Sequence, residues 1–337
     1  ADSAARGPAM RLVRYDLPGR DPVRNLAIEE TLTRSWSGDR LGLLFYRHDP
    51  AVILGRNQNP WIEADLAELH RRGTPLVRRG SGGGAVYHDP GNLNYGVIMP
   101  RSCYEPTRVL GVVVAALRAL GIDARACQRS SIWIGDAKIS GTAFMLTGRA
   151  ALLHGCILID TRLDDLRRLL DAPPAALTSQ AVPSVRSPVT RLCDHDPHLT
   201  PEAVCDSLTE QAMREFAGDP AAVHGDPPEP SEEILKRLAS WEWLYGRTPA
   251  FERRLESPRG SITLSLRQAR VEAVTSTDDR FDPARLQAAL KGCPGDGEAL
   301  ANAVLADNGL AAAAASDLAA LLRREMPPLP APGATVT

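Results

Sequence analysis

The order of apolar and polar positions predicts alternating helices and strands through the first two thirds of the chain. Residues 25–36 have the apolar spacing of an amphipathic helix. Residues 107–121 read as a mostly buried helix that ends at Gly121. Short apolar runs predict buried strands, of which the first two are expected to pair with each other, at 42–48, 51–55, 131–135 and 154–160.

A proline-rich segment then divides the chain. Residues 219–231 hold four prolines and little that could pack, which indicates a domain boundary. We expect a large α/β domain over 10–218 and a small α+β domain over 232–326, and we hypothesise that the small domain swings about the linker. Residues 327–337 are rich in proline, and we expect a disordered tail there. For the small domain the pattern predicts two strands within 260–276 and helices near 282–291, 298–306 and 314–325.

Composition and charge narrow the class of protein. The 337 residues carry a formal net charge of −2, which provides no bulk attraction to nucleic acid or to an anionic membrane. No apolar stretch approaches the roughly 18 residues of a membrane span. Six cysteines without a CxxC spacing favour a reducing compartment over a zinc ribbon or a disulfide scaffold. The first residues have no apolar signal core, so we expect Met10 to be the native start and residues 1–9 to be a tag remnant; a trimmed transit peptide is the alternative.

A polar, glycine-rich segment lies between two of the apolar runs, at residues 78–95. Its consecutive glycines, 82–84, let a ligand approach main-chain N–H groups closely. The preceding Arg78 and Arg79 suit an anion such as a nucleotide phosphate. The spacing fits neither a P-loop nor the GxGxxG dinucleotide fingerprint. The segment is therefore an anion-binding candidate, with a flexible hairpin loop as the alternative.

Lysine is rare enough in this chain to draw attention to each occurrence. Arginine supplies 36 of the 39 basic residues, and Lys138 lies beside a Ser-Gly turn within residues 136–143. A lysine near a strand end is usually solvated, but a compact ammonium with three donors can bridge a carboxylate and a phosphate. His154 begins the strand predicted at 154–160 and suits either a binding site or the interior as a satisfied core histidine.

Six motifs occur together along the chain, in the order GRNQNPW (55–61), RRGSGGGAVYHDPGNLNY (78–95), KISGTA (138–143), HG (154–155), SVRSPVTRL (184–192) and WEWLYGRTPAF (241–251). Together they resemble the lipoate–protein ligase A family. The first four are also found in the wider group of lipoyl and octanoyl transferases. The last two are more particular to ligases with an accessory C-terminal domain and to the related animal lipoyltransferase.

The resemblance implies a fold, an activity and partners. The fold is that of the biotin/lipoate ligase superfamily, with a large mixed-sheet catalytic domain followed by a small α+β accessory domain. The activity joins lipoate to ATP, with Mg²⁺ on the phosphates, and then passes the acyl group of lipoyl-AMP to one lysine. The implied acceptors are apo lipoyl domains of 2-oxoacid dehydrogenase E2 subunits and the glycine-cleavage H protein. We expect a monomer in the cytoplasm or, alternatively, in the mitochondrial matrix.

The resemblance also assigns roles to matching positions. Lys138 would contact the acyl carbonyl and the α-phosphate and stabilise charge that develops in both half-reactions. Arg79 would bind phosphate, and Arg186 is a candidate phosphate contact in a loop that closes over the adenylate. The implied ATP and adenylate set is Arg79, Ser81, Gly83, Gly84, Ala85, Val86, Tyr87, Asn92, Lys138 and Arg186. The implied lipoate set is Leu26, Gly84, Lys138 and His154, with Val52, Leu54 and Val97 as further walls of an apolar tunnel.

Departures from the family pattern keep other functions open. Many relatives carry Arg-Asn-Asp before the lysine, where this chain has Arg129, Ser130 and Ser131. The carboxylate that could hold adenine or magnesium is therefore missing, and the protein could prefer a preformed acyl-AMP or another acyl donor. An acyltransferase with Cys127 as a thioester-forming nucleophile is one alternative. A biotin ligase would need a biotin loop that is absent, and a non-catalytic regulator would not need Lys138 beside the glycines.

Overall fold

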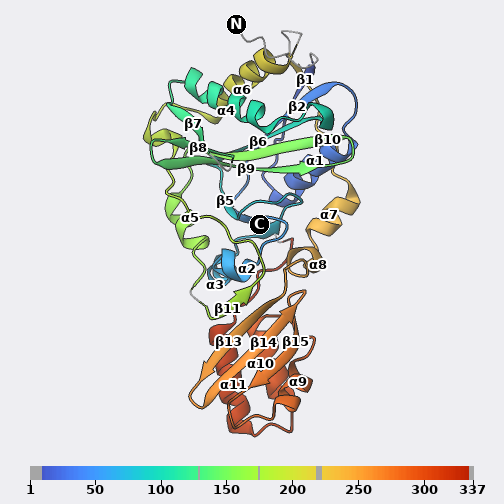
Figure 1. The fold of residues 1–337 in the computed structure, drawn as a ribbon, viewed down its shortest axis with the longest axis vertical. Helices are drawn as coiled ribbons and strands as arrows, with labels where there is room; N and C mark the ends of the chain where they lie inside the picture. Colours follow the sequence, from blue (N-terminus) through green and yellow to red (C-terminus); the bar gives the residue numbers. More distant parts are fainter. Residues whose placement is uncertain (1–9, 128–129, 174, 218–221, 334–337) are drawn as a thin grey trace.

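The computed structural model describes residues 10–127, 130–173, 175–217 and 222–333. The tag remnant or transit segment expected at residues 1–9 lies outside these ranges. Among the described residues, none of the helices is long and apolar enough to cross a membrane. Figure 1 shows an elongated molecule, in which a large α/β unit continues into a smaller unit built mainly from the C-terminal part of the chain.

A mixed sheet of eight strands forms the centre of the large unit, as expected (Figure 1). Its first strands pair in parallel, β1 with both β12 and β2, and all remaining neighbours pair antiparallel. In spatial order the strands are β12 (Val223–His224), β1 (Arg11–Asp16), β2 (Arg40–Tyr46), β6 (Asn92–Pro100), β10 (Ala150–Leu158), β9 (Ala137–Leu146), β8 (Ser131–Ile134) and β7 (Ala124–Cys127).

Helices cover both faces of this sheet. The predicted helix at 25–36 is confirmed as α1 (Pro22–Ser35), where the Asp21 side chain accepts the amides of the first turn. The predicted helix at 107–121 is confirmed as α4 (Pro106–Ala119), and it packs with α6 (Pro201–Phe216) on the opposite face. The 3₁₀ turns η1 (Arg101–Cys103) and η2 (Leu192–Asp194) and the helix α5 (Leu163–Leu169) lie in the connections.

A second, three-stranded sheet lies beside the large one. In spatial order its strands are β4 (Leu76–Arg78), β3 (Ala51–Leu54) and β5 (Val86–His88). Along the chain, the helices α2 (Pro60–Glu63) and α3 (Leu66–Arg72) connect β3 to β4. The expected pairing of the strands at 42–48 and 51–55 is wrong. Strand β2 pairs with β1 and β6, whereas β3 pairs with β4 and β5, so the chain changes sheets between them.

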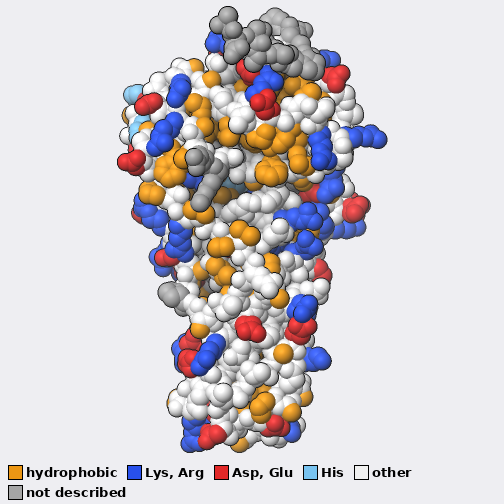
Figure 2. Space-filling view, in the orientation of Figure 1, with side chains coloured by type: hydrophobic (Ala, Val, Ile, Leu, Met, Phe, Trp, Pro, Cys, Tyr) orange, Lys and Arg blue, Asp and Glu red, His pale blue; other side chains and the backbone are white. Residues whose placement is uncertain are grey.

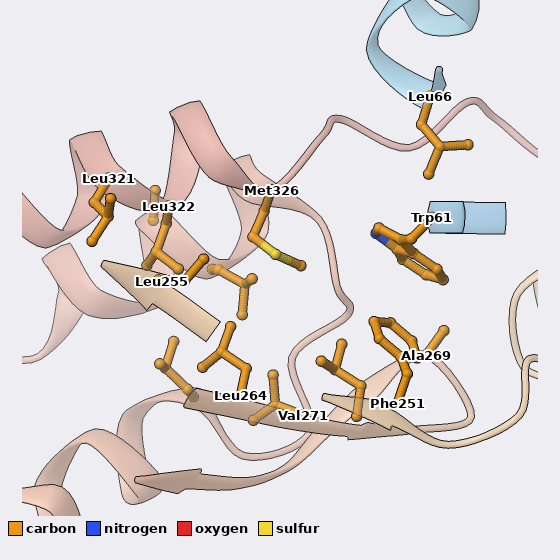
Figure 3. Close-up of a cluster of buried hydrophobic side chains, with 14 of the residues drawn as sticks. Trp61, Leu66, Phe251, Leu255, Leu264, Ala269, Val271, Leu321, Leu322 and Met326 are labelled. Atoms are coloured by element: carbon orange, nitrogen blue, oxygen red, sulfur yellow. The ribbon is translucent and has the colours of Figure 1, made fainter. Parts of the chain in front are cut away.

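The small unit is a four-stranded antiparallel sheet backed by three helices, and its predicted strands and helices are confirmed. The strands are β11 (Leu177–Ser179), β13 (Phe251–Ser257), β14 (Gly260–Arg267) and β15 (Arg270–Ser276), and the helices are α9 (Pro283–Leu290), α10 (Gly297–Ala306) and α11 (Ala312–Glu325). Strand β11 comes from the earlier part of the chain and pairs with β13. Figure 3 shows Trp61 and Leu66 of the large unit facing Phe251, Ala269 and Met326 in one hydrophobic core.

The boundary between the units differs from the expected linker. Residues 219–221 lie outside the described chain, but β12 follows at once as an edge strand, so the segment is not loose where it is described. Helices α7 (Glu232–Leu238) and α8 (Trp241–Leu244), which we expected in the small domain, pack against α1 and β4 of the large unit. The expected disordered tail is also partly fixed, because the Leu329 amide donates to Asp296 and the Pro330 carbonyl accepts from Tyr245.

Candidate functional site

Two cavities meet at Lys138. The first cavity has a volume of about 790 Å³ and lies between the three-stranded sheet and the strands β8 to β10. The second has a volume of about 590 Å³ and extends toward α5. Both are lined by Lys138, Gly141 and Cys156 and by Ala85 and Val86 at the end of the glycine loop, which we define as residues 80–86. Gly82, Gly83 and Gly84 of this loop line the first cavity only. A ligand could therefore pass from one cavity to the other beside the Lys138 ammonium.

The glycine loop is held in shape by Arg79. The buried guanidinium donates to the carbonyls of Gly82, Gly84 and Ile53 and to the Ser81 hydroxyl. Gly83 has a φ of +87°, and a Cβ there would lie 2.8 Å from Arg79 Nη2, so only glycine suits the position. Burial lowers the pKa of Arg79 to about 10, which leaves the side chain cationic at neutral pH. The segment is thus an ordered wall of the first cavity.

A covering segment, residues 182–189, lies across both cavities. The Ser184 hydroxyl accepts hydrogen bonds from the Ala85 amide at 2.8 Å and from Gln58 Nε2 at 2.9 Å, and the Ser184 amide donates to Glu63. Its far end pairs with Lys138, whose main-chain amide donates to the Pro188 carbonyl at 2.8 Å. The segment is tied down at both ends, although the Val185 side chain at its middle is 64% exposed.

Lys138 offers an uncompensated positive charge at the junction. No carboxylate among the described residues lies within ion-pair distance of its ammonium, whereas the exposed Lys236 pairs with Glu232 in α7. A Cβ at Gly141 would lie 3.2 Å from Lys138 Nζ, so the absence of a side chain there makes room for the ammonium. No Asp or Glu lines the described wall of the first cavity. Arg79 and Lys138 therefore give this cavity a positive potential that suits a carboxylate or phosphate.

A buried chain of hydrogen bonds lies behind the glycine loop. Glu29 Oε1 lies 2.8 Å from His154 Nδ1, and His154 Nε2 lies 2.7 Å from Ser81 Oγ. Ser81 in turn accepts the Arg79 Nε–H at 3.0 Å. The Tyr46 hydroxyl donates to Glu29 Oε2 at 2.8 Å; burial, with Glu29 beside it, holds the pKa of this phenol well above its usual value. Both ring nitrogens of His154 are thus occupied by protein groups.

The structure brings most of the predicted site residues to the cavities. The first cavity is lined by Leu26, Arg79, Gly83, Gly84, Ala85, Val86, Lys138 and His154, and the second by Ala85, Val86, Tyr87, Lys138 and Arg186. The Arg186 guanidinium pairs with the exposed Asp171 carboxylate at the second cavity. Ser81 lines neither cavity, because its hydroxyl is enclosed between Arg79 and His154.

Several predicted positions face away from the cavities. Asn92 is fully buried and donates to Asn94, which is the residue that lines the first cavity. Val52 and Leu54 point into the core shared with the small unit, and Val97 points into the core beneath α4. The tunnel wall expected from these three side chains is therefore wrong. Successive side chains of a strand point to opposite faces, so on β3 it is Ile53 that lines the first cavity.

Two residues that bear on the alternative functions, Ser131 and Cys127, also lie at the first cavity. Arg129 is outside the described residues, but the Ser131 hydroxyl lines the cavity wall and accepts the Trp133 indole N–H at 2.9 Å. Cys127 lines the same cavity. Sequence reasoning missed Cys156, which lines both cavities beside Lys138. Burial raises the pKa of the Cys156 thiol, although Lys138 and Arg79 act in the opposite direction, so the environment favours the neutral thiol.

Few of the described side chains at the two cavities could serve as carboxylate ligands of a metal ion. Within the described ranges, no cluster of three or more His, Cys, Asp or Glu side chains is arranged to hold a metal ion. The carboxylates that face the second cavity are Glu63, which accepts the Ser184 amide, and Asp171.

Hydrophobic side chains gather over the large unit on the face shown in Figure 2, whereas charges of both signs are scattered over the small unit.

Known proteins similar to this chain include lipoate-protein ligases. The family model for the lipoyl protein ligase A/B catalytic domain matches residues 21–213. A lipoate-protein ligase A of Psychrobacter cryohalolentis is 31% identical over 277 residues, which cover 78% of this chain and 81% of that protein. A candidate lipoate-protein ligase A of Schizosaccharomyces pombe is 34% identical over 274 residues, which cover 73% of this chain and 74% of that protein.

Solved structures of similar fold include complexes with ligands. A candidate lipoate protein ligase of T. acidophilum with bound lipoic acid superposes with a TM-score of 0.60 at 28% identity, over 71% of this chain and 100% of that one. A lipoate-protein ligase A bound with ATP gives 0.59 at 29% identity, over 70% and 98%. The bi-partite ligase of Thermoplasma acidophilum, studied with its E2 lipoyl domain, gives 0.59 at 30% identity, over 70% and 96%.

Proposed function

The chain belongs to the lipoyl protein ligase A/B catalytic-domain family, and from this premise we propose how its two cavities carry out an ATP-dependent ligation of lipoate to protein. It is a lipoate–protein ligase that uses ATP. The observation that carries the residue assignment is the position of Lys138. Its ammonium lacks a carboxylate partner among the described residues and lies where the two cavities meet the glycine loop.

The acyl chain of lipoate enters the first cavity in this proposal. Leu26, Ile53 and Val86 supply apolar walls there, and the carboxylate end faces Lys138. The nucleotide follows the glycine loop and the covering segment toward the second cavity, where Arg186 lies. The phosphate that becomes joined to the acyl group then sits at the junction. The positive charge of Arg79, which lines the first cavity, attracts this phosphate.

Lys138 acts in both half-reactions. In the first, a lipoate carboxylate oxygen attacks the α-phosphorus of ATP, and the bond to the departing pyrophosphate breaks. In the second, the amine nitrogen of an acceptor lysine attacks the acyl carbon, the acyl–phosphate C–O bond breaks, and the amine loses a proton as AMP leaves. Charge develops on oxygens beside the ammonium in each step, and a fixed donor in a water-poor site stabilises it strongly.

A magnesium ion would be held mainly through the nucleotide. Mg²⁺ in such sites keeps several waters and takes one or two carboxylates together with substrate phosphates. Asp171 at the second cavity is exposed and could supply one carboxylate, whereas Glu63 is buried and occupied by the Ser184 amide. This donor set suits an ion that is fixed by phosphates, and the ion would neutralise phosphate charge there.

The acceptor is a lipoyl domain in this proposal, as for the archaeal ligase studied with its E2 lipoyl domain. The glycine-cleavage H protein is a second proposed acceptor, because it presents the same kind of lysine. We place the enzyme, as a monomer, in the cytoplasm or in the mitochondrial matrix. The six cysteines are all free in the structure, which supports a compartment that keeps thiols reduced.

The decisive experiment compares two lysine variants. Wild type, Lys138→Ala and Lys236→Ala are incubated with lipoate, ATP, Mg²⁺ and an apo lipoyl domain, and the acceptor is followed by intact-mass spectrometry. We expect Lys138→Ala to slow modification by at least about 100-fold, because an electrostatic donor at the reacting oxygens is lost. Lys236→Ala, which removes an exposed lysine from α7, should match wild type. Full activity of Lys138→Ala would exclude the assignment.

A second candidate function is transfer from a preformed donor. It is favoured by Ser131, which stands at the first cavity where many relatives carry a carboxylate. Synthetic lipoyl-AMP distinguishes the two: modification with lipoyl-AMP but not with lipoate and ATP would support the transferase. A thioester route would in addition require that Cys127→Ser or Cys156→Ser abolish modification from either donor, while Lys138→Ala leaves it intact.

A further inference from the structure

We propose that Glu29 is a positioning residue of this enzyme, which fixes the ring tautomer of His154 and, through Ser81, the orientation of the Arg79 guanidinium at the wall of the first cavity. This inference rests on the proposed function only for the identity of the ligand that Arg79 meets. The chain of contacts itself is a property of the protein without substrate.

The contacts connect three segments that are far apart in sequence. Glu29 lies in α1, His154 in β10, and Ser81 and Arg79 in the turn after β4. Three successive links of 2.8, 2.7 and 3.0 Å join them in that order. All four side chains are more than nine-tenths buried, so water does not compete for these hydrogen bonds.

The direction of each hydrogen bond follows from the donors available. The Glu29 carboxylate is an acceptor, so His154 Nδ1 must carry the hydrogen. Arg79 Nε can only donate, so Ser81 Oγ accepts from it, and its single hydroxyl hydrogen is left for His154 Nε2. For a neutral His154 ring, one arrangement of hydrogens satisfies every partner. It requires the Nδ1–H tautomer of His154, and the Glu29 carboxylate selects that tautomer.

Arg79 is the last residue in this series of hydrogen bonds, and the bonds it already makes determine what else it can bind. Of its five N–H groups, Nε is used by Ser81 and Gly82, both on Nη2 are used by Gly82 and Gly84, and one on Nη1 is used by Ile53. One Nη1–H therefore remains for a ligand. No described carboxylate forms an ion pair with Arg79; burial lowers the pKa of Arg79, and Cys156 and then Glu29 act in the opposite direction.

Glu30 provides a matched control. It is the next residue of α1 and is equally buried, but it pairs with Arg34 and Arg237 instead of His154. Glu29→Ala removes the acceptor of the chain, whereas Glu29→Gln keeps an amide oxygen that can accept the Nδ1–H. Ser81→Ala leaves Glu29 and His154 together but disconnects them from Arg79.

The first measurement is of the His154 tautomer, by long-range ¹H–¹⁵N NMR of the histidine-labelled protein without substrate. We expect the Nδ1–H form in wild type, Glu29→Gln, Glu30→Gln and Ser81→Ala, and loss of that single form in Glu29→Ala. The second is the KM for ATP. We expect a rise of about tenfold in Glu29→Ala and Ser81→Ala, with kcat changed less than threefold, and less than a threefold rise in the two glutamine variants.

The two readouts separate failure of this inference from failure of the proposed function. If wild type does not ligate lipoate, the tautomer result still tests the role of Glu29. An Nδ1–H tautomer that survives Glu29→Ala overturns the inference. A KM for ATP that is unchanged in both Glu29→Ala and Ser81→Ala also overturns it, and if Glu29→Ala does not fold, Ser81→Ala decides this point alone.

Discussion

Single side chains in this protein take roles that depend on what surrounds them. Arg78 and Arg79 are neighbours in sequence, yet one is enclosed by carbonyls at the boundary of the two units and the other shapes the glycine loop. His154 lines a cavity but has no ring nitrogen free for substrate. Residue type alone therefore indicates the chemistry that is available, whereas the hydrogen-bond partners indicate whether it is used.

Two buried histidines make stability depend on pH. His48 and His88 share a hydrogen bond of 3.0 Å between their Nδ1 atoms. Burial lowers the pKa of His48 to about 3 and holds the pKa of His88 well below its usual value. The folded state therefore keeps both rings neutral, while the unfolded chain protonates them near pH 6.5. Stability is fully present above this pH and is lost as the pH falls toward the folded pKa values.

We expect the free energy of unfolding to fall by about 2.5 kcal/mol between pH 7.5 and pH 5.5 on account of this pair. Urea unfolding at the two pH values measures it. His48→Gln removes one of the two protonations and should reduce the fall by about half. A fall that is the same in His48→Gln as in wild type would show that other groups cause it.

At the scale of elements, the short strand β3 separates the ligand site from the shared core. Its odd and even positions face opposite ways: Ile53 lines the first cavity, and Leu54 packs with Trp61, Leu66 and the small unit. Both side chains are almost fully buried, so exposure does not distinguish them. What distinguishes the two side chains is the face of the three-stranded sheet on which each lies, toward the first cavity for Ile53 and toward the shared core for Leu54.

A pair of alanine substitutions on β3 tests this division. Ile53→Ala and Leu54→Ala each remove the same number of buried carbons and should each lower stability by about 2–4 kcal/mol. Only Ile53→Ala should also raise the KM for lipoate, by about tenfold, since it reshapes the acyl cavity. Steady-state kinetics with lipoate as the varied substrate, together with urea unfolding, provide both readouts. Equal KM values for the two variants would contradict the proposed acyl cavity.

At the scale of the whole molecule, the small unit is attached by more than the proline-rich segment. Strand β11 pairs with β13, and the Trp61 and Phe251 rings lie 4.9 Å apart between centroids. Helices α7 and α8, which follow the proline-rich segment, remain on the large unit. A swing about residues 219–231 would therefore have to break these contacts, and the proposed domain movement remains a hypothesis that structures with and without acyl-AMP can test.

Arg78 should contribute strongly to this attachment. Its fully buried side chain donates to the Leu244 carbonyl, to Thr248 and to three carbonyls of the turn at 55–58. Burial lowers its pKa to about 10, so it stays charged at neutral pH. Arg78→Met would leave these acceptors without donors, at about 1–3 kcal/mol for each buried group.

We expect the thermal midpoint of Arg78→Met to fall by at least about 5 °C, measured by differential scanning calorimetry. Arg71→Met is the control, because Arg71 is exposed and its one ion pair among the described residues is with Glu68, three residues earlier in α3. Glu68 keeps its ion pairs with Arg72 and Arg168 when Arg71 is replaced, so the control should stay within about 2 °C of wild type. Equal shifts in the two variants would show that the Arg78 contacts do not hold the units together.

The sequence alone predicted the elements and the chemistry that local patterns encode. Apolar periodicity was sufficient for α1, α4 and the helices of the small unit, because one helix or strand face recurs at a fixed spacing. The glycine loop and Lys138 were also identified from sequence, since consecutive glycines and a rare lysine are visible without any neighbour. The order of the six motifs along the chain also indicated the protein family.

Only the tertiary structure decided which faces meet. A strand pattern shows that Ile53 and Leu54 point in opposite directions, but not which direction holds the cavity. The role of Glu29 depends on His154, which helix packing brings close over more than a hundred residues of sequence. The position of Cys156 beside Lys138 depends on the pairing of β10 with β9. Such contacts are set by the packing of the whole chain, because hydrogen-bond geometry requires positions accurate to a few tenths of an ångström that no local pattern specifies.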